Sequence, residues 1–70
     1  MTAAELKRAR HQLGLSAEGL AQMCRVSSGR TVRRWEAGIR DIPGPAAVLI
    51  TLALQSAEVR TLLGIDHLSQ

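Results

Sequence analysis

The chain is poor in the residues that usually stabilise a very small domain. It has 70 residues with no Tyr or Phe, one Trp, one Cys and two Pro. A single cysteine excludes an intrachain disulfide, and the shortage of aromatics means that aliphatic side chains must fill the core. No period-two alternation of apolar residues is present, which argues against strands. No apolar run has the length of a membrane span or a signal peptide. These absences predict one small, all-helical, cytoplasmic domain.

The positive charge lies mainly in one segment. Nine Lys and Arg against six Asp and Glu give a formal net charge of +3. Between Arg25 and Arg40 there are five arginines and one acid, Glu36, so that segment alone carries +4. Basic side chains gathered in one segment indicate a polyanionic partner.

Capping and terminating residues divide the chain into five expected helices. Thr2 and Glu5 have the spacing of a capping box, and Gly14 can end the first helix in a left-handed conformation. The expected helices cover residues 3–13, 17–24, about 29–37, 44–55 and 57–63. Residues 1–65 then form one domain and 66–70 a C-terminal tail. Gly19 lies inside the second helix at a cost of about 1 kcal/mol relative to alanine, and close approach of another backbone is the reason we expect for it.

The segment Ser16–Gly38 predicts a helix-turn-helix, two short helices around a tight turn. Ser16 caps the first of these helices, and Ser27 or Ser28 caps the second. At about 100° per residue the second helix has two different faces. Its arginines share one narrow stripe, whereas Val32, Trp35 and Ile39 lie on the opposite side. We expect the Trp35 ring to be buried between the first, second and fourth helices.

The fourth helix, with the sequence PAAVLITLALQ, is apolar on nearly every side. A surface helix would show one apolar stripe, so two interpretations arise. Either this is a central core helix wrapped by the other helices or by another subunit, or it is partly exposed and supports dimerisation through the fifth helix. The residues expected to mediate dimerisation are Val59, Leu62 and Leu63.

Three strings carry a resemblance to a known family: LGLS at 13–16, Leu20-Ala21, and TVRRWEAG at 31–38. They resemble the Cro and lambdoid-phage repressor type of helix-turn-helix, also called the Xre family, over about residues 3–65. The resemblance implies a compact five-helix, all-α domain of lambda-repressor-like type. The family usually has Gly where this chain has Arg25, and the turn before Thr31 is one residue longer here, where Gly29 can relax strain.

The resemblance implies that a recognition helix, about Gly29–Ala37, lies in the major groove of double-stranded DNA. Arginine can donate two hydrogen bonds to guanine O6 and N7, so arginines should dominate base reading. The residues expected to read bases are Ser28, Arg30, Arg33 and Arg34. The residues expected to contact phosphates are Ser16, Ala17, Ser27, Thr31 and Arg40, in part through backbone N–H groups at a helix N-terminus.

Arg10 and Glu36 are expected to form a structural ion pair. Arg10 lies on the same face of the first helix as Leu6 and Leu13, and Glu36 flanks Trp35 on the inward side of its helix. An unpaired charge at either position would carry a large desolvation cost, so each implies a partner. The resemblance agrees, because Cro-like domains commonly pair an arginine and a glutamate at these two places.

No catalytic, metal or cofactor site is expected. His11 and His67 are far apart and come with no metal-ligand spacing, and Cys24 lies on the apolar side of the second helix. The expected function is that of a sequence-specific DNA-binding transcriptional regulator, a repressor or autorepressor of a small phage or prophage-type operon. The resemblance implies that it binds a palindromic operator as a homodimer. Two alternatives stay open. One is an antitoxin that neutralises a toxin partner and binds DNA secondarily, and the other is an adaptor whose helix-turn-helix no longer touches DNA.

Overall fold

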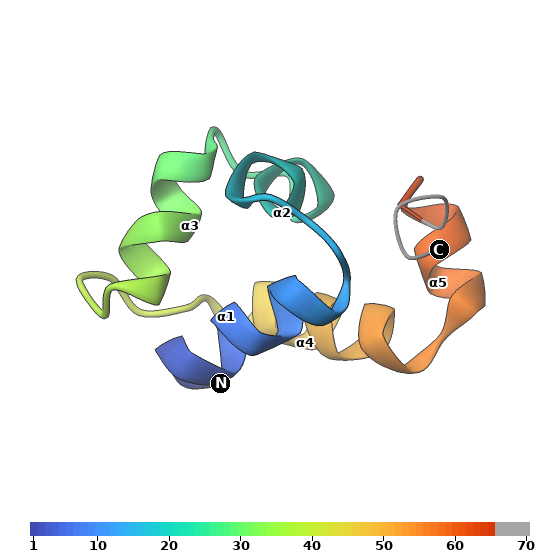
Figure 1. Cartoon of the computed structure of the whole chain (residues 1–70), viewed down its shortest axis with the longest axis horizontal. Helices are drawn as coiled ribbons and strands as arrows, with labels where there is room; N and C mark the ends of the chain where they lie inside the picture. The colour runs from blue at the N-terminus through green and yellow to red at the C-terminus, as the bar shows by residue number, and fades with distance from the viewer. Residues whose placement is uncertain (66–70) are drawn as a thin grey trace.

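The computed structural model describes residues 1–65, and this part of the chain consists of five α-helices without any strand (Figure 1). The helices are α1 (Ala3–Gln12), α2 (Ala17–Met23), α3 (Gly29–Glu36), α4 (Gly44–Gln55) and α5 (Ala57–Leu62). The predicted all-α class and the five helices are confirmed, with ends within about one residue of the expected ones. The predicted tail, 66–70, and His67 lie outside the described residues.

Hydroxyl side chains begin three of the helices. The predicted capping box of α1 is present: Thr2 Oγ1 accepts from Glu5 N–H at 3.1 Å, and Glu5 Oε1 accepts from Thr2 N–H at 2.7 Å. Ser16 caps α2 by accepting from Gly19 N–H at 3.0 Å, and Ser56 caps α5. Ser28 holds the N-cap position of α3, but its side chain makes no capping hydrogen bond. Ser28 is therefore the N-cap residue, one of the two that the sequence predicted, but the capping hydrogen bond expected from its side chain is absent.

Four helices end in the same way, with the residue after the C-cap in a left-handed conformation. These residues are Gly14 (φ 70°), Arg25 (φ 59°), Gly38 (φ 74°) and Gly64 (φ 76°). After α2, for example, Val26 N–H donates to Ala21 O at 3.0 Å. This is the hydrogen bond of a Schellman motif that spans six residues. Three of the four positions carry glycine, which adopts this conformation without steric cost. Arg25 adopts it as an ordinary L-residue.

An aliphatic core joins the helices, as the composition predicted. Its largest fully buried side chains are Leu6, Leu20, Met23, Val32 and Ile50. Trp35 belongs to the same core and is 3% exposed, so its predicted burial is confirmed. The core connects α1, α2, α3 and α4, and it therefore holds α3 by its inward face.

α4 is only partly covered by the other helices of residues 1–65, so the expectation that those helices wrap it as a central core helix is wrong. Its coverage by another subunit stays a prediction. One side of α4 is buried through Ala46, Ile50 and Ala53, whereas Val48 and Leu52 on the other side are 60% and 46% exposed. The physical reason is that α2 packs mainly on α3, so that α1 and α5 are left as the main neighbours of α4. An open hollow of about 620 Å³ lies between α1 and α4. Even so, none of the helices in residues 1–65 is long and apolar enough to cross a membrane.

A single residue, Ser56, connects α4 to α5. It is both the C-cap of α4 and the N-cap of α5, and its backbone is extended at φ −134° and ψ 118°. From α5, Arg60 Nη1 donates back to Ala53 O at 2.8 Å near the end of α4. The bend between the two helices is thus held by the Ser56 cap at the junction and by the hydrogen bond from Arg60 to α4.

Candidate nucleic-acid interface

α2 and α3 form the expected helix-turn-helix, and a glycine allows them to approach closely. Gly29, the first residue of α3, is buried. A Cβ atom at Gly29 would lie 2.5 Å from Glu18 Oε1 and 2.9 Å from the backbone N of Glu18. Only glycine fits so close to the start of α2. The close approach expected at Gly19 is wrong, because the nearest atoms to a Cβ there are 3.4 Å away, an ordinary contact distance.

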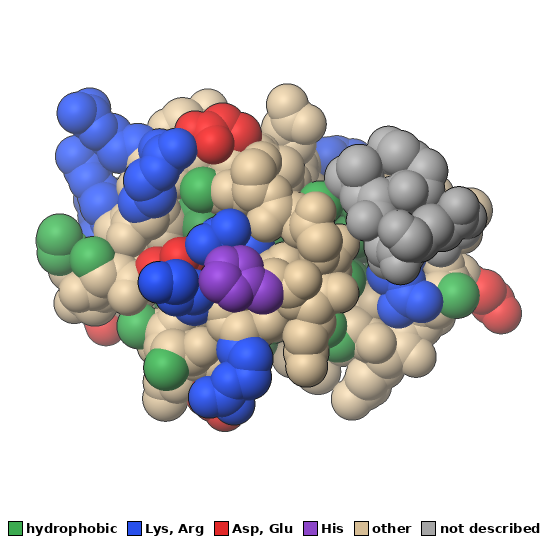
Figure 2. Space-filling model, viewed as in Figure 1, with side chains coloured by type: hydrophobic (Ala, Val, Ile, Leu, Met, Phe, Trp, Pro, Cys, Tyr) green, Lys and Arg blue, Asp and Glu red, His purple; other side chains and the backbone are tan. Residues whose placement is uncertain are grey.

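The outward side of α3 carries three arginines, which we call the basic face: Arg30, Arg33 and Arg34. All three are exposed, whereas Val32 and Trp35 on the inward side are 0% and 3% exposed. The predicted separation of the two faces is confirmed for Val32 and Trp35. It is wrong for Ile39, which is 74% exposed because it follows the end of α3 at Glu36. Figure 2 shows Lys and Arg side chains gathered at the α3 end of the molecule, at the upper left of the view. Within residues 1–65, Arg30 and Arg34 have no ion-pair partner.

The third arginine of the basic face has a carboxylate partner that the sequence reasoning missed. Arg33 Nη2 donates to Glu18 Oε1 at 2.7 Å, and the two side chains are 61% and 59% exposed. The hydrogen bond from Arg33 lowers the pKa of Glu18 below its usual value, with a smaller contribution from the backbone. A signal for this contact exists in the sequence: Gly29 and Arg33 are four residues apart and share one face of α3, where the missing side chain leaves space.

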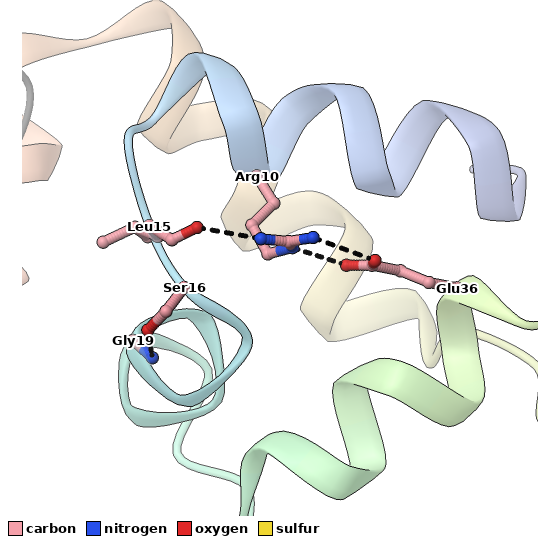
Figure 3. A network of polar contacts seen from close by, with 5 residues as sticks. All are labelled: Arg10, Leu15, Ser16, Gly19 and Glu36. Atoms are coloured by element: carbon pink, nitrogen blue, oxygen red, sulfur yellow. Dashed lines mark hydrogen bonds and ion pairs between the residues drawn. The ribbon is translucent and has the colours of Figure 1, made fainter.

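The predicted ion pair between Arg10 and Glu36 is present, and it joins α1 to the end of α3 (Figure 3). Arg10 Nε donates to Glu36 Oε2 at 2.7 Å, and Arg10 Nη2 donates to Oε1 at 3.2 Å. Arg10 Nη1 also donates to Leu15 O at 3.1 Å, in the connection between α1 and α2. The hydrogen bond to Glu36 raises the pKa of Arg10 above its usual value. Glu36 therefore lies away from the basic face.

The residues predicted to contact phosphates lie around α3 and at the start of α2. Ser27 is exposed just before α3, next to the predicted base reader Ser28, and Arg40 is exposed after the end of α3, whereas Thr31 is half-buried. Ser16 and Ala17 lie at the start of α2, where the Ser16 hydroxyl accepts from Gly19 N–H and the Ala17 side chain is buried. Glu18 follows directly, so the start of α2 carries an anion beside the expected phosphate contact.

The three residues predicted for dimerisation differ in exposure. Leu62 is 84% exposed, whereas Val59 and Leu63 are partly buried and pack against the core of the same chain. The sequence reasoning did not single out Val48 and Leu52, which α4 exposes.

A family model described as a helix-turn-helix domain matches residues 3–64. This range contains α2, α3 and the other helices of the described structure. No curated protein and no solved structure gives a match to the chain. The close contact of α2 with α3 and the exposed arginines on the outward side of α3 agree with this match. Because the family model covers most of the sequence, the chain belongs to the helix-turn-helix domain family and is a DNA-binding protein.

Proposed function

We propose that this protein is a sequence-specific transcriptional regulator that binds a palindromic operator as a homodimer and represses, or autoregulates, a small operon of phage or prophage type. The observation that carries the proposal is the division of α3 into two faces. Its inward face is fixed by Val32 and Trp35, and its outward face exposes three arginines. A rigid helix with arginines on its free face suits direct reading of base edges in the major groove.

The single acid of α3 supports this orientation. Glu36 pairs with Arg10 and its side chain is only 11% exposed, so it adds little repulsion toward phosphates at the outward face. Arg30 and Arg34, which lack carboxylate partners among residues 1–65, can donate to guanine O6 and N7. Each such bidentate contact discriminates against a wrong base by roughly 1–3 kcal/mol. The Ser28 hydroxyl, which makes no capping bond, can donate to a base or a phosphate.

Phosphate contacts would fix the register of α3 on the duplex. Arg40 and Ser27 are exposed on either side of α3 and can contact the backbone strands beside the groove. Thr31, Ser16 and Ala17 would contribute mainly through hydroxyl or backbone N–H groups. The affinity for DNA should fall as the salt concentration rises. A plot of log Kd against the logarithm of the salt concentration should have a slope of roughly 0.9 for each phosphate contacted.

Selection of bound sequences from a random duplex pool tests the proposal. A palindrome with half-site centres about 34–36 Å apart, or a multiple of that, is the expected result for a dimer. Arg34→Ala should then lose discrimination between operator and random duplex, whereas Arg40→Ala should weaken binding to both about equally. Arg8→Ala, an exposed arginine of α1, is the matched control. A pool without enrichment, or equal losses for Arg34→Ala and Arg40→Ala on both duplexes, would overturn the proposal.

A second candidate function is the antitoxin, and one observation favours it. α4 and α5 expose Val48, Leu52 and Leu62, which a protein partner would cover. A homodimer can cover the same side chains, and sedimentation of the purified protein separates the two functions. A dimer whose dissociation constant rises in Leu62→Glu supports the repressor. A monomer that forms a stoichiometric complex with the product of a neighbouring toxin-sized reading frame supports the antitoxin.

A further inference from the structure

One exposed acid lies within the DNA-binding surface and needs an explanation. Between Ser16 and Arg40 the sequence has two acids, Glu18 and Glu36. Glu36 is turned toward Arg10, but the Glu18 side chain is 59% exposed next to the basic face. A carboxylate at that place repels phosphates and lowers the affinity for any DNA, whatever its sequence. The presence of Glu18 at this place therefore points to a role other than increasing the affinity for DNA.

The position of the Glu18 carboxylate depends on Gly29. The space that a Cβ of Gly29 would take is filled by Glu18, with Oε1 at 2.5 Å and Cδ at 2.6 Å from that point. Arg33 lies one turn later on the same face of α3, and its Nη2 reaches the same Oε1 at 2.7 Å. The Arg33 side chain is thus drawn back over the first turn of α3, the part of a recognition helix that contacts base edges.

The contact changes what Arg33 can do. The guanidinium has five N–H donors in a fixed planar arrangement, and the bond from Nη2 to Glu18 leaves other donors for a second acceptor. The nearby negative charge offsets the attraction of Arg33 to phosphates, whereas hydrogen bonds to guanine O6 and N7 depend on direction and remain available. An arginine without such a partner would be free to swing to the phosphate backbone.

We propose that Glu18 is a specificity-determining positioning residue, which holds Arg33 for a guanine base and away from the phosphates. The proposal rests on the proposed function, since it needs α3 to lie in the major groove. Glu18 acts through Arg33 and contributes to base choice without being itself the main reader.

Binding of the full-length protein to its selected operator and to a random duplex, at several salt concentrations, tests this role. Glu18→Gln removes the charge and keeps the shape. We expect it to bind random duplex more tightly than wild type and to steepen the salt slope by roughly 0.9, because Arg33 gains a phosphate contact. The ratio of operator to random affinity should fall roughly 5- to 150-fold, the value of one bidentate guanine contact. Repeated selection with Glu18→Gln should lose a guanine at one position of the half-site.

Two controls separate positioning from other effects. Glu58→Gln makes the same charge change on exposed α5 and should alter neither the affinity ratio nor the selected sequence. In an Arg33→Ala background, Glu18→Gln should no longer change the ratio. Thermal unfolding checks that each variant is folded, which is expected because the contact is exposed.

Each outcome bears on one of the two proposals. If wild type selects an operator and Glu18→Gln keeps the same ratio, slope and half-site, the positioning role is overturned while the proposed function stands. If Glu18→Gln raises the affinity for both duplexes equally and leaves their ratio unchanged, Glu18 acts only as a charge that repels DNA. That result also overturns the positioning role. If wild type selects no sequence, the proposed function fails, and the positioning role fails with it.

Discussion

Arg10 and Glu36 stand 26 positions apart in the sequence and meet through two hydrogen bonds, Nε to Oε2 at 2.7 Å and Nη2 to Oε1 at 3.2 Å. With the third bond from Arg10 to Leu15 O, one side chain connects α1, the α1–α2 connection and the end of α3. The two side chains are 15% and 11% exposed, so the pair is largely withdrawn from water. It fixes the end of α3 that lies away from Gly29.

We predict that Arg10→Met or Glu36→Gln alone lowers the free energy of unfolding by about 2 kcal/mol. Removing one partner of a fully buried pair typically costs about 3–5 kcal/mol, and the residual exposure of this pair reduces that value. A double-mutant cycle by thermal unfolding should give a coupling energy of roughly 1–2 kcal/mol. The same cycle on Glu18 and Arg33, which are exposed, should give about 0–1 kcal/mol. Equal coupling in the two pairs would contradict the assigned burial.

The two helical glycines of the helix-turn-helix should respond to alanine in opposite directions. Gly29→Ala places a Cβ 2.9 Å from the backbone N of Glu18, which cannot move as a side chain can, so we expect a loss of about 1–3 kcal/mol. Gly19→Ala meets its nearest atoms at 3.4 Å and should stabilise α2 by up to about 1 kcal/mol. Urea unfolding of the two variants beside wild type measures both values. A destabilised Gly19→Ala would show that space, rather than helix propensity, governs that position.

Arg25→Gly is predicted to stabilise the fold by about 0.5–1 kcal/mol. Arg25 has φ 59°, a conformation that costs an L-residue roughly 1–2 kcal/mol, and glycine avoids that cost but loses more backbone entropy on folding. Arg25→Ala is the control, because it removes the guanidinium and keeps the strained backbone. Chemical denaturation should therefore give Arg25→Gly a higher free energy of unfolding than Arg25→Ala. The reverse order would exclude backbone strain at Arg25 as the cause of any gain in stability.

Truncation of Trp35 should cost about 3–5 kcal/mol, the range for large aromatic residues in a core. A domain of 70 residues has a total stability of roughly 4–10 kcal/mol, so Trp35→Ala is expected to be largely or wholly unfolded. The wild-type protein provides an independent measurement, since it contains one Trp. Its emission should be shifted to shorter wavelength in the native state and move to longer wavelength in urea. Emission at the wavelength of free indole in water would contradict the burial.

Cys24 should react slowly with iodoacetamide in the native protein. Burial raises the pKa of its thiol, so at a given pH below that pKa less of the reactive thiolate is present than in an unfolded chain. We therefore expect a lower alkylation rate at pH 8 in buffer than in urea, with the difference shrinking as pH rises. Equal rates in the two solvents, measured by mass spectrometry, would mean that the thiol is accessible.

Local signals in the sequence predicted most of the fold. The Thr2–Glu5 capping box, the glycines after α1 and α3, and the apolar positions around Trp35 each depend on residues within a few positions of one another. The Arg10–Glu36 contact was also predictable, because two charges on inward faces each need a partner. For the Glu18–Arg33 contact, the spacing of Gly29 and Arg33 indicated free space on α3. It could not show that Glu18 fills this space, since both side chains are exposed and either could have remained solvated. Likewise, the composition of α4 could not show which apolar side chains the other short helices would leave uncovered.

The one-residue connection at Ser56 restricts how α5 can be oriented relative to α4. Rotation of α5 about its junction with α4 would have to break the Ser56 bond to Val59 N–H or the Arg60 bond to Ala53 O, so the two helices move as one angled body. The backbone of Leu62, near the end of that body, is thereby held in a set direction, so that contact there orders mainly the Leu62 side chain. A second copy bound there would be oriented by the angle at Ser56. That angle would then set the distance between two recognition helices along the DNA.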